Sequence, residues 1–213
     1  MHLKPWRNKE LPPDERAESL LKELSLDEKM AQLSCVFPFG ELAQDMDRIS
    51  EQTPFGIGQI STLEVRRIET LEQAADWQRR VQETVIRNSP HGIPAIFHME
   101  GLCGAFIQDS TSFPSGIARG AGWDPVLEEE IAKTVSRQES ACGVTHIFAP
   151  VLDISRDSRM GRQGESYGED ATLAGVLGAA YTRGVQQTET GGRRPESAFT
   201  RTSGITTWKV PGK

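Results

Sequence analysis

Short apolar runs that alternate with long amphipathic stretches constrain the fold of this 213-residue chain more than any other feature. The runs at 56–61, 93–98 and 145–150 predict three strands. The stretches at 65–88, 124–143 and 171–187 have helical spacing. Strands that alternate with helices predict right-handed βα units and a parallel sheet. This pattern leaves open a doubly wound sheet or a barrel, and in both the chemistry lies at the carboxyl ends of the strands.

Two helices are predicted before the first of these units. Pro12 and Pro13 offer a helix start, and acidic residues follow in the first turn. Ser25 and Glu28 form a capping box, in which the serine caps the second helix and the glutamate bonds back to the serine backbone. Met30 and Leu33 continue the apolar side of that second helix.

Charge and composition argue against several kinds of partner. The net charge is −6 and no basic patch stands out, so we expect no nucleic-acid partner. No run of eighteen apolar residues and no apolar leader occurs, so we expect no membrane association and a cytoplasmic protein. Cys35, Cys103 and Cys142 have no metal-ligand spacing and are predicted to be thiols in a reducing compartment.

The character of the sequence changes after residue 188. A turn-rich segment follows, and residues 196–213 show neither strand nor helix periodicity. We therefore predict one domain over residues 1–188 and an irregular tail over residues 189–213. A further strand would be expected in this tail, but the pattern does not reveal one. We interpret the change as the sign of a truncated or frame-shifted gene product.

Charged residues gather after the second and third predicted strands. Glu100 follows the second strand, and the segment 153–170 holds three arginines and five carboxylates. Such density indicates either an ion-pair network or an arginine that faces a hydroxyl-rich or anionic ligand. A metal site from His98, Glu100, His146 and Asp153 is an alternative, although their spacing is not that of metal ligands. The glycine-rich segment 116–122 lacks the strand-turn-helix context of a phosphate loop.

Several segments resemble one enzyme family in the order in which that family has them. The segment 16–33 resembles the opening helix pair of glycoside hydrolase family 3, and 92–100 resembles its second-strand block. Phe113-Pro114, Trp123-Asp124 and Ala149-Pro150 follow, and the most specific piece is Gly161-Arg162 with the segment 165–170. The resemblance covers residues 14–187 and is greatest to β-glucosidases and β-xylosidases.

This resemblance implies both a fold and an activity. It implies an α/β fold that is a partial (β/α)8 barrel of TIM type, with about the first three βα units preceded by two N-terminal helices. It implies retaining hydrolysis of terminal β-D-glucosyl or β-D-xylosyl residues in carbohydrate metabolism, without cofactor or metal. Glu100 and Arg162 correspond to the family's sugar-binding carboxylate and arginine. Asp157, Arg159 and Glu165 would support the loop that aims Arg162.

The chain also departs from the family pattern. No histidine follows His146, so the lysine-histidine pair of the fourth strand is absent. Ser158 and Met160 stand where the family usually has proline and tryptophan. We expect no catalytic residue in this chain, because the nucleophile and the acid/base would lie downstream. The chain is thus predicted to be an inactive fragment that self-associates through an open barrel edge. A non-catalytic sugar-binding or barrel-complementing module and a metal-dependent barrel enzyme are the alternatives.

Overall fold

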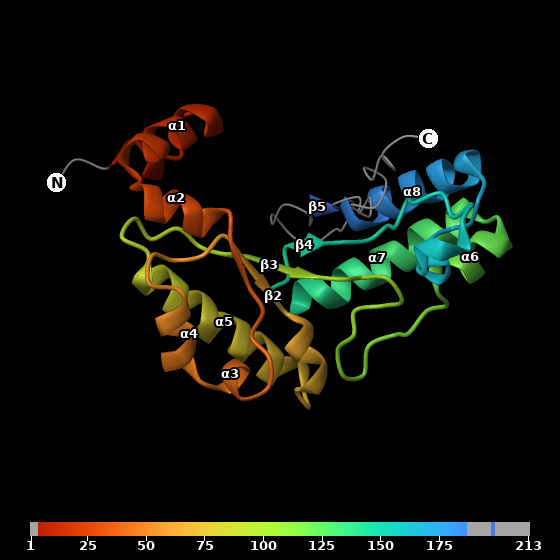
Figure 1. The fold of residues 1–213 in the computed structure, drawn as a ribbon, viewed down its shortest axis with the longest axis horizontal. Coiled ribbons are helices and arrows are strands. Elements are labelled where there is room, and N and C mark those ends of the chain that lie inside the picture. The colour runs from red at the N-terminus through yellow and green to blue at the C-terminus, as the bar shows by residue number, and fades with distance from the viewer. Residues whose placement is uncertain (1–3, 187–196, 199–213) are drawn as a thin grey trace.

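A computed structural model describes residues 4–186 and 197–198 and shows a parallel sheet with helices packed against it (Figure 1). The strands are short: β1 (Cys35–Val36), β2 (Gln59–Ser61), β3 (Ile96–Met99), β4 (His146–Ile147) and β5 (Ser197–Ala198). All neighbouring pairs are parallel, and the order in space is the order in sequence, β1-β2-β3-β4-β5. Sequential order favours a barrel, because a doubly wound sheet reverses its strand order at a switch point.

The helices follow the predicted scheme, with additions. The α-helices are α1 (Pro13–Glu23), α2 (Leu26–Gln32), α3 (Glu41–Gln44), α4 (Met46–Gln52), α5 (Leu71–Asn88), α6 (Gly116–Gly122), α7 (Pro125–Ala141) and α8 (Ala171–Gln186). Short 3-10 turns are η1 (Pro5–Arg7), η2 (Leu63–Arg67), η3 (Ser158–Met160) and η4 (Gln163–Glu165). The stretch predicted as one helix over 65–88 is divided between η2 and α5, and Thr70 caps α5 by accepting from the Gln73 amide.

Local capping chemistry fixes the helix ends as predicted. Ser25 and Glu28 form both bonds of the capping box on α2. The Asp124 carboxylate accepts from the Val126 and Leu127 amides at the start of α7. That helix ends at Cys142, and Gly143 follows with φ of +80°, a conformation that glycine adopts without steric cost. Each of these ends is determined by residues within a few positions of it.

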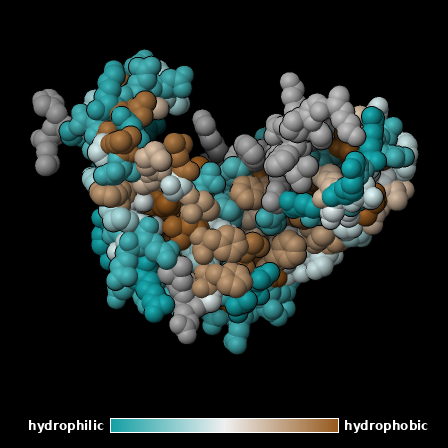
Figure 2. Space-filling model, viewed as in Figure 1, coloured by the Kyte–Doolittle hydropathy of each residue, from teal (hydrophilic) through white to brown (hydrophobic). Residues whose placement is uncertain are grey.

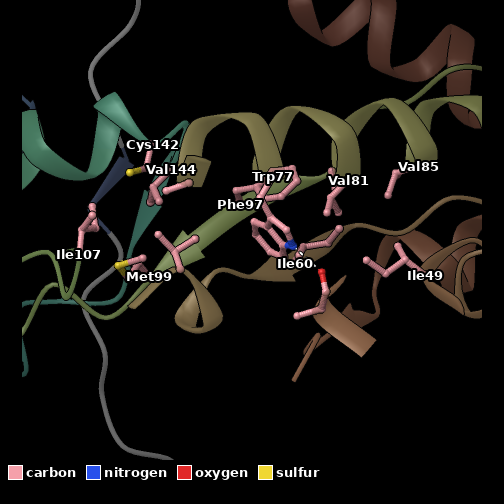
Figure 3. Close-up of a cluster of buried hydrophobic side chains, with 14 of the residues drawn as sticks. Ile49, Ile60, Trp77, Val81, Val85, Phe97, Met99, Ile107, Cys142 and Val144 are labelled. Carbon is pink, nitrogen blue, oxygen red and sulfur yellow. Dashed lines mark hydrogen bonds between the residues drawn. The ribbon is translucent and has the colours of Figure 1, made fainter. Parts of the chain in front are cut away.

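The main hydrophobic core lies between the sheet and α5 (Figure 3). Trp77, Val81 and Val85 project from α5 toward Ile60 and Phe97 of the strands, and all five are buried. The Trp77 indole donates a hydrogen bond of 2.5 Å to the Ala43 carbonyl, so its polar end is satisfied inside the core. A second cluster joins α7 to α8 beside β4, and these two helices lie together at the other end of the sheet (Figure 1).

Three features differ from the sequence-based predictions. Strand β1 was missed, because two residues carry no readable periodicity. The segment 189–213 was predicted to be irregular, yet Ser197–Ala198 pairs with β4 as β5, so that prediction is wrong at this point. The rest of the segment lies outside the described residues, and the domain boundary at 188 stays a prediction. The apolar side predicted for α2 is exposed rather than buried, with Leu33 at 84% and Met30 at 55%.

The described helices include none that is long and apolar enough to cross a lipid bilayer. Cys35, Cys103 and Cys142 are free thiols, as their spacing predicts.

Candidate functional site

One face of the sheet packs against α5 and the other does not, and β3 has side chains on both faces. Phe97 and Met99 belong to the core shared with α5. Because side chains alternate along a strand, His98 points to the opposite face, which we call the inner face. Strand register then assigns the neighbours, since directly paired residues point the same way. The inner face comprises Cys35, Gln59, Ser61, Ile96, His98 and His146.

Contacts on the inner face centre on His98. Its Nε2 lies 3.4 Å from the Cys35 sulfur, and its ring stacks on Phe148 with centroids 4.3 Å apart. His146 meets the edge of the same phenyl ring at 5.4 Å. Burial, with the charge of His146 as a second cause, lowers the pKa of His98 to about 4. Burial also lowers the pKa of His146, so both imidazoles are neutral at pH 7 and act as packing groups.

Glu100 lies at the carboxyl end of β3, two residues beyond His98, and is half-buried. Its carbonyl accepts from the Ala149 amide at 3.0 Å, which ties the ends of β3 and β4 together. The next residue, Gly101, has φ of +69°, and a Cβ there would lie 2.5 Å from the Ile147 Cγ2. The Tyr181 hydroxyl donates to the Gly101 carbonyl at 2.6 Å. The backbone turn that carries Glu100 is therefore fixed by two hydrogen bonds, one from the Ala149 amide and one from the Tyr181 hydroxyl.

Arg162 lies in the loop between β4 and α8, which we define as residues 148–170 and call the β4–α8 loop. Its guanidinium forms a two-point ion pair with Glu165, with Nε to Oε1 at 2.8 Å and Nη2 to Oε2 at 2.5 Å. The hydrogen bond to Glu165 raises the pKa of Arg162, and the charges of Glu165, Glu100 and Asp153 add to that rise. The charges of three carboxylates, Glu165, Glu100 and Asp153, thus act on this arginine.

The β4–α8 loop is closed on itself and anchored on the helices. The Ser155 amide donates to the Gly168 carbonyl at 3.0 Å, and the hydroxyls of Ser155 and Ser166 are 2.5 Å apart. Leu152 and Ile154 pack against the cluster that contains Tyr167 and α8 side chains. The half-buried position of Arg162 is therefore set by a packed loop.

Asp157 and Arg159, predicted to support Arg162, lie at the exposed part of this loop. Arg159 is bound to the Asp157 carboxylate through Nε and Nη2, and the side chains are 90% and 51% exposed respectively. Hydrogen bonds from Arg159 lower the pKa of Asp157 to about 2. The Asp157 carbonyl accepts from Gln163 at 3.2 Å, a single link to the turn that carries Glu165. Of the predicted supporting residues, Glu165 alone is bonded to Arg162.

Other residues at the site were missed by sequence reasoning. Asp153 is buried and acts on Arg162, although the sequence suggested it only as a metal ligand. Its position in the charged segment that follows β4 could have indicated this role. Arg119, Glu128 and Tyr167 form a buried polar cluster behind the loop, and their separation in sequence gives no pattern to detect. Among the described residues, no three His, Cys, Asp or Glu side chains are grouped to hold a metal ion.

Comparison with known proteins gives a consistent result. The sequence model of the "Glycosyl hydrolase family 3 N terminal domain" matches residues 25–204. A protein of the β-xylosidase type from Formosa agariphila is 30% identical over 190 residues, which cover 86% of this chain and 25% of that protein. The lysosomal β-glucosidase of Dictyostelium discoideum is 33% identical over 112 residues, covering 52% of this chain and 14% of its own length.

Solved structures agree with these relatives. A β-glucosidase from Erythrobacter marinus superposes with a TM-score of 0.80 at 26% identity, covering 93% of this chain and 26% of that one. The Listeria innocua β-glucosidase in complex with laminaribiose superposes with a TM-score of 0.64 at 29% identity, covering 81% of this chain and 24% of its own. The chain thus spans between 14% and 26% of the length of these proteins, and its fold is the first part of their TIM-like barrel.

The neutral, buried state of His98 predicts a pH dependence of stability. The pKa of His98 is about 4 in the folded chain against an ordinary 6.5, so the unfolded chain binds more protons between these values. The free energy of unfolding should therefore fall as pH drops through this window. In a His98→Gln variant the fall should be shallower, by up to about 1.4 kcal/mol per pH unit. Urea denaturation of both proteins across the window measures this, and equal slopes would contradict it.

Proposed function

Since the chain belongs to glycoside hydrolase family 3, we propose that it forms the sugar-gripping part of a glycosidase site for terminal β-D-glucosyl or β-D-xylosyl units. The observation that carries the proposal is the placement of Arg162, held by Glu165 and under the charge of Glu100 and Asp153, at the carboxyl edge of a parallel sheet. That edge is where barrel enzymes bind their substrates.

The chemistry of these groups suits a ring of hydroxyls. A sugar hydroxyl both donates and accepts hydrogen bonds, a carboxylate only accepts and a guanidinium only donates. Glu100 would accept from one hydroxyl while Arg162 donates to its neighbour. The names of the relatives, β-xylosidase and β-glucosidase, support β-linked glucosyl or xylosyl units as the ligand.

We propose further that the bond-breaking carboxylates are not among the residues of this chain. Retaining hydrolysis requires a nucleophile and an acid/base on opposite sides of the bond, about 5 Å apart. Glu100 and Asp153 instead act through their charges on Arg162, which suits binding. Relatives about four times as long have further sequence to provide the two catalytic groups. Catalysis by the 213-residue chain alone is therefore not expected.

The first test is turnover. The purified chain, incubated with p-nitrophenyl β-D-glucoside and β-D-xyloside, should release no more nitrophenol than a Glu100→Ala variant prepared in the same way. The reason is that neither protein would supply the pair of carboxylates that the reaction requires. Release by the natural chain clearly above that of the variant would place catalytic groups within these residues and contradict the proposal.

The second test is binding, which also addresses a sugar-binding module without catalysis. Titration calorimetry with glucose and xylose should give dissociation constants on the order of millimolar, since one part of a site supplies few contacts. Glu100→Gln and Arg162→Lys should each weaken binding by about tenfold or more, because each loses a charge-assisted or two-point hydrogen bond. Arg159→Gln, which removes an exposed arginine of the same loop, is the matched control and should bind as the natural chain does. Absence of binding heat with both sugars would refute the proposal that this chain binds them.

We also propose that the isolated chain associates with a second copy of itself. Large apolar side chains stay exposed, among them Phe37, Phe39, Leu33 and Ile96, and apolar residues gather across the middle of the face in Figure 2. Strand β1 is an edge of the described sheet, and an edge strand offers unpaired backbone groups. Both features favour association.

Sedimentation velocity tests this association. The average sedimentation coefficient should rise with protein concentration, because exposed edges and apolar side chains become buried between copies. A Phe37→Ser/Phe39→Ser double variant should show a smaller rise. A natural chain that sediments as a monomer at every concentration would contradict the idea.

A further inference from the structure

Helix α6 approaches the β4–α8 loop more closely than any residue with a side chain would permit. Gly116 and Gly120 lie one turn apart on the same side of α6. A Cβ at Gly116 would lie 2.2 Å from the Glu165 carbonyl oxygen, and one at Gly120 would lie 2.3 Å from the Tyr167 carbonyl oxygen. The helix backbone therefore rests directly on the backbone of residues 165–167.

A buried polar cluster centred on Glu128 of α7 links α6 to the β4–α8 loop. The Arg119 guanidinium of α6 lies 3.4 Å from the Glu128 carboxylate of α7, and their side chains are only 5% and 2% exposed. The Tyr167 hydroxyl donates to the other oxygen of Glu128 at 2.5 Å. Arg119 also faces the rings of Tyr167 and Tyr181, at 5.9 and 5.6 Å from their centroids. Removing one partner would leave a buried charge uncompensated, so this arrangement resists displacement.

Tyr167 follows Glu165 by two residues, and Glu165 grips Arg162. A shift of Tyr167 is therefore transmitted through a short, packed segment to the ion pair that aims Arg162. We propose that Gly120 of α6, together with the Arg119–Glu128–Tyr167 cluster, positions Arg162 for its ligand. The consequence for sugar binding rests on the function proposed above, whereas the effect on Arg162 itself does not.

A pair of glycine substitutions in one helix tests this. Gly120→Ala forces a methyl group against the Tyr167 carbonyl, whereas Gly122→Ala in the same helix meets open space. Both changes replace glycine by alanine within α6, and alanine is the better helix former, so a loosening seen only with Gly120→Ala reports the contact. The readout is the Nε–H signal of Arg162 in 15N NMR of the full chain, identified by its loss in Arg162→Lys. In the natural chain this proton is bonded to Glu165 and should exchange slowly with water.

We expect Gly120→Ala to shift the Arg162 signal and speed its exchange, and Gly122→Ala to leave it unchanged. Where the natural chain binds glucose or xylose, Gly120→Ala should weaken that binding by about tenfold, the loss expected for a misdirected charged hydrogen bond. A folded Gly120→Ala protein with an unaltered Arg162 signal would overturn the positioning role. Absence of sugar binding by the natural chain would refute the proposed function, while the NMR signal still decides the role of α6.

Tyr167→Phe provides a second test and should disturb the fold less, because it adds no atoms. It keeps the ring in its packed cluster and removes only the hydroxyl bonded to Glu128. We expect faster exchange of the Arg162 Nε–H with unchanged far-ultraviolet circular dichroism. This variant decides the matter if Gly120→Ala fails to fold, and an Arg162 signal identical to that of the natural chain would overturn the proposal. Glu129→Gln, a half-buried glutamate of α7 that pairs with Lys133 and Arg183 and lies outside the Arg119–Glu128–Tyr167 cluster, is the control.

Discussion

The alternation of side chains along β3 is the constraint on which the rest of the structure depends. Phe97 and Met99 must meet α5 to complete the core, and this obliges His98 to face the other way; Glu100 follows directly after the strand end. A shift of one residue in register would exchange the two rows and bury the charged residue in the helix layer. The core and the candidate site are therefore determined together: the packing that stabilises the sheet also presents Glu100 at its carboxyl edge.

Much of this fold could be predicted because its signals are local. The capping box at Ser25 and the cap at Asp124 each involve residues within three positions, and the structure forms both. The two-residue strands β1 and β5 could not be read, because their strand character comes from pairing with neighbours and not from their own sequence. The glycine-rich helix α6 was not predicted as a helix, since glycine has low helix propensity and its close approach to residues 165–167 is not visible in the sequence.

Part of the candidate site could likewise be predicted from the sequence, and part could not. Glu100, Arg162 and Glu165 were singled out by position and family resemblance; the structure pairs Arg162 with Glu165, and Glu100 acts on Arg162 through its charge, while their role as sugar ligands stays a prediction. The density of charge after β4 was interpreted as an ion-pair network or a ligand-facing arginine. The loop holds two ion pairs, Asp157 with Arg159 at the surface and Arg162 with Glu165, and a ligand-facing role of Arg162 stays a prediction. The Arg119–Glu128–Tyr167 cluster could not be anticipated, because it joins three segments that only the packing of α6, α7 and the loop places in contact.

Arg162 has more hydrogen-bond donors than its ion pair with Glu165 uses. A guanidinium has five N–H donors, and the two bonds to Glu165 occupy Nε and one donor of Nη2. That two-point contact fixes the plane of the group and leaves three donors that the ion pair does not use. With its plane fixed, the guanidinium can distinguish hydroxyls by direction, which a freely rotating ammonium cannot do. Glu100 and Asp153 keep the surroundings negative, so a neutral, hydroxyl-rich ring fits this site better than an anion would.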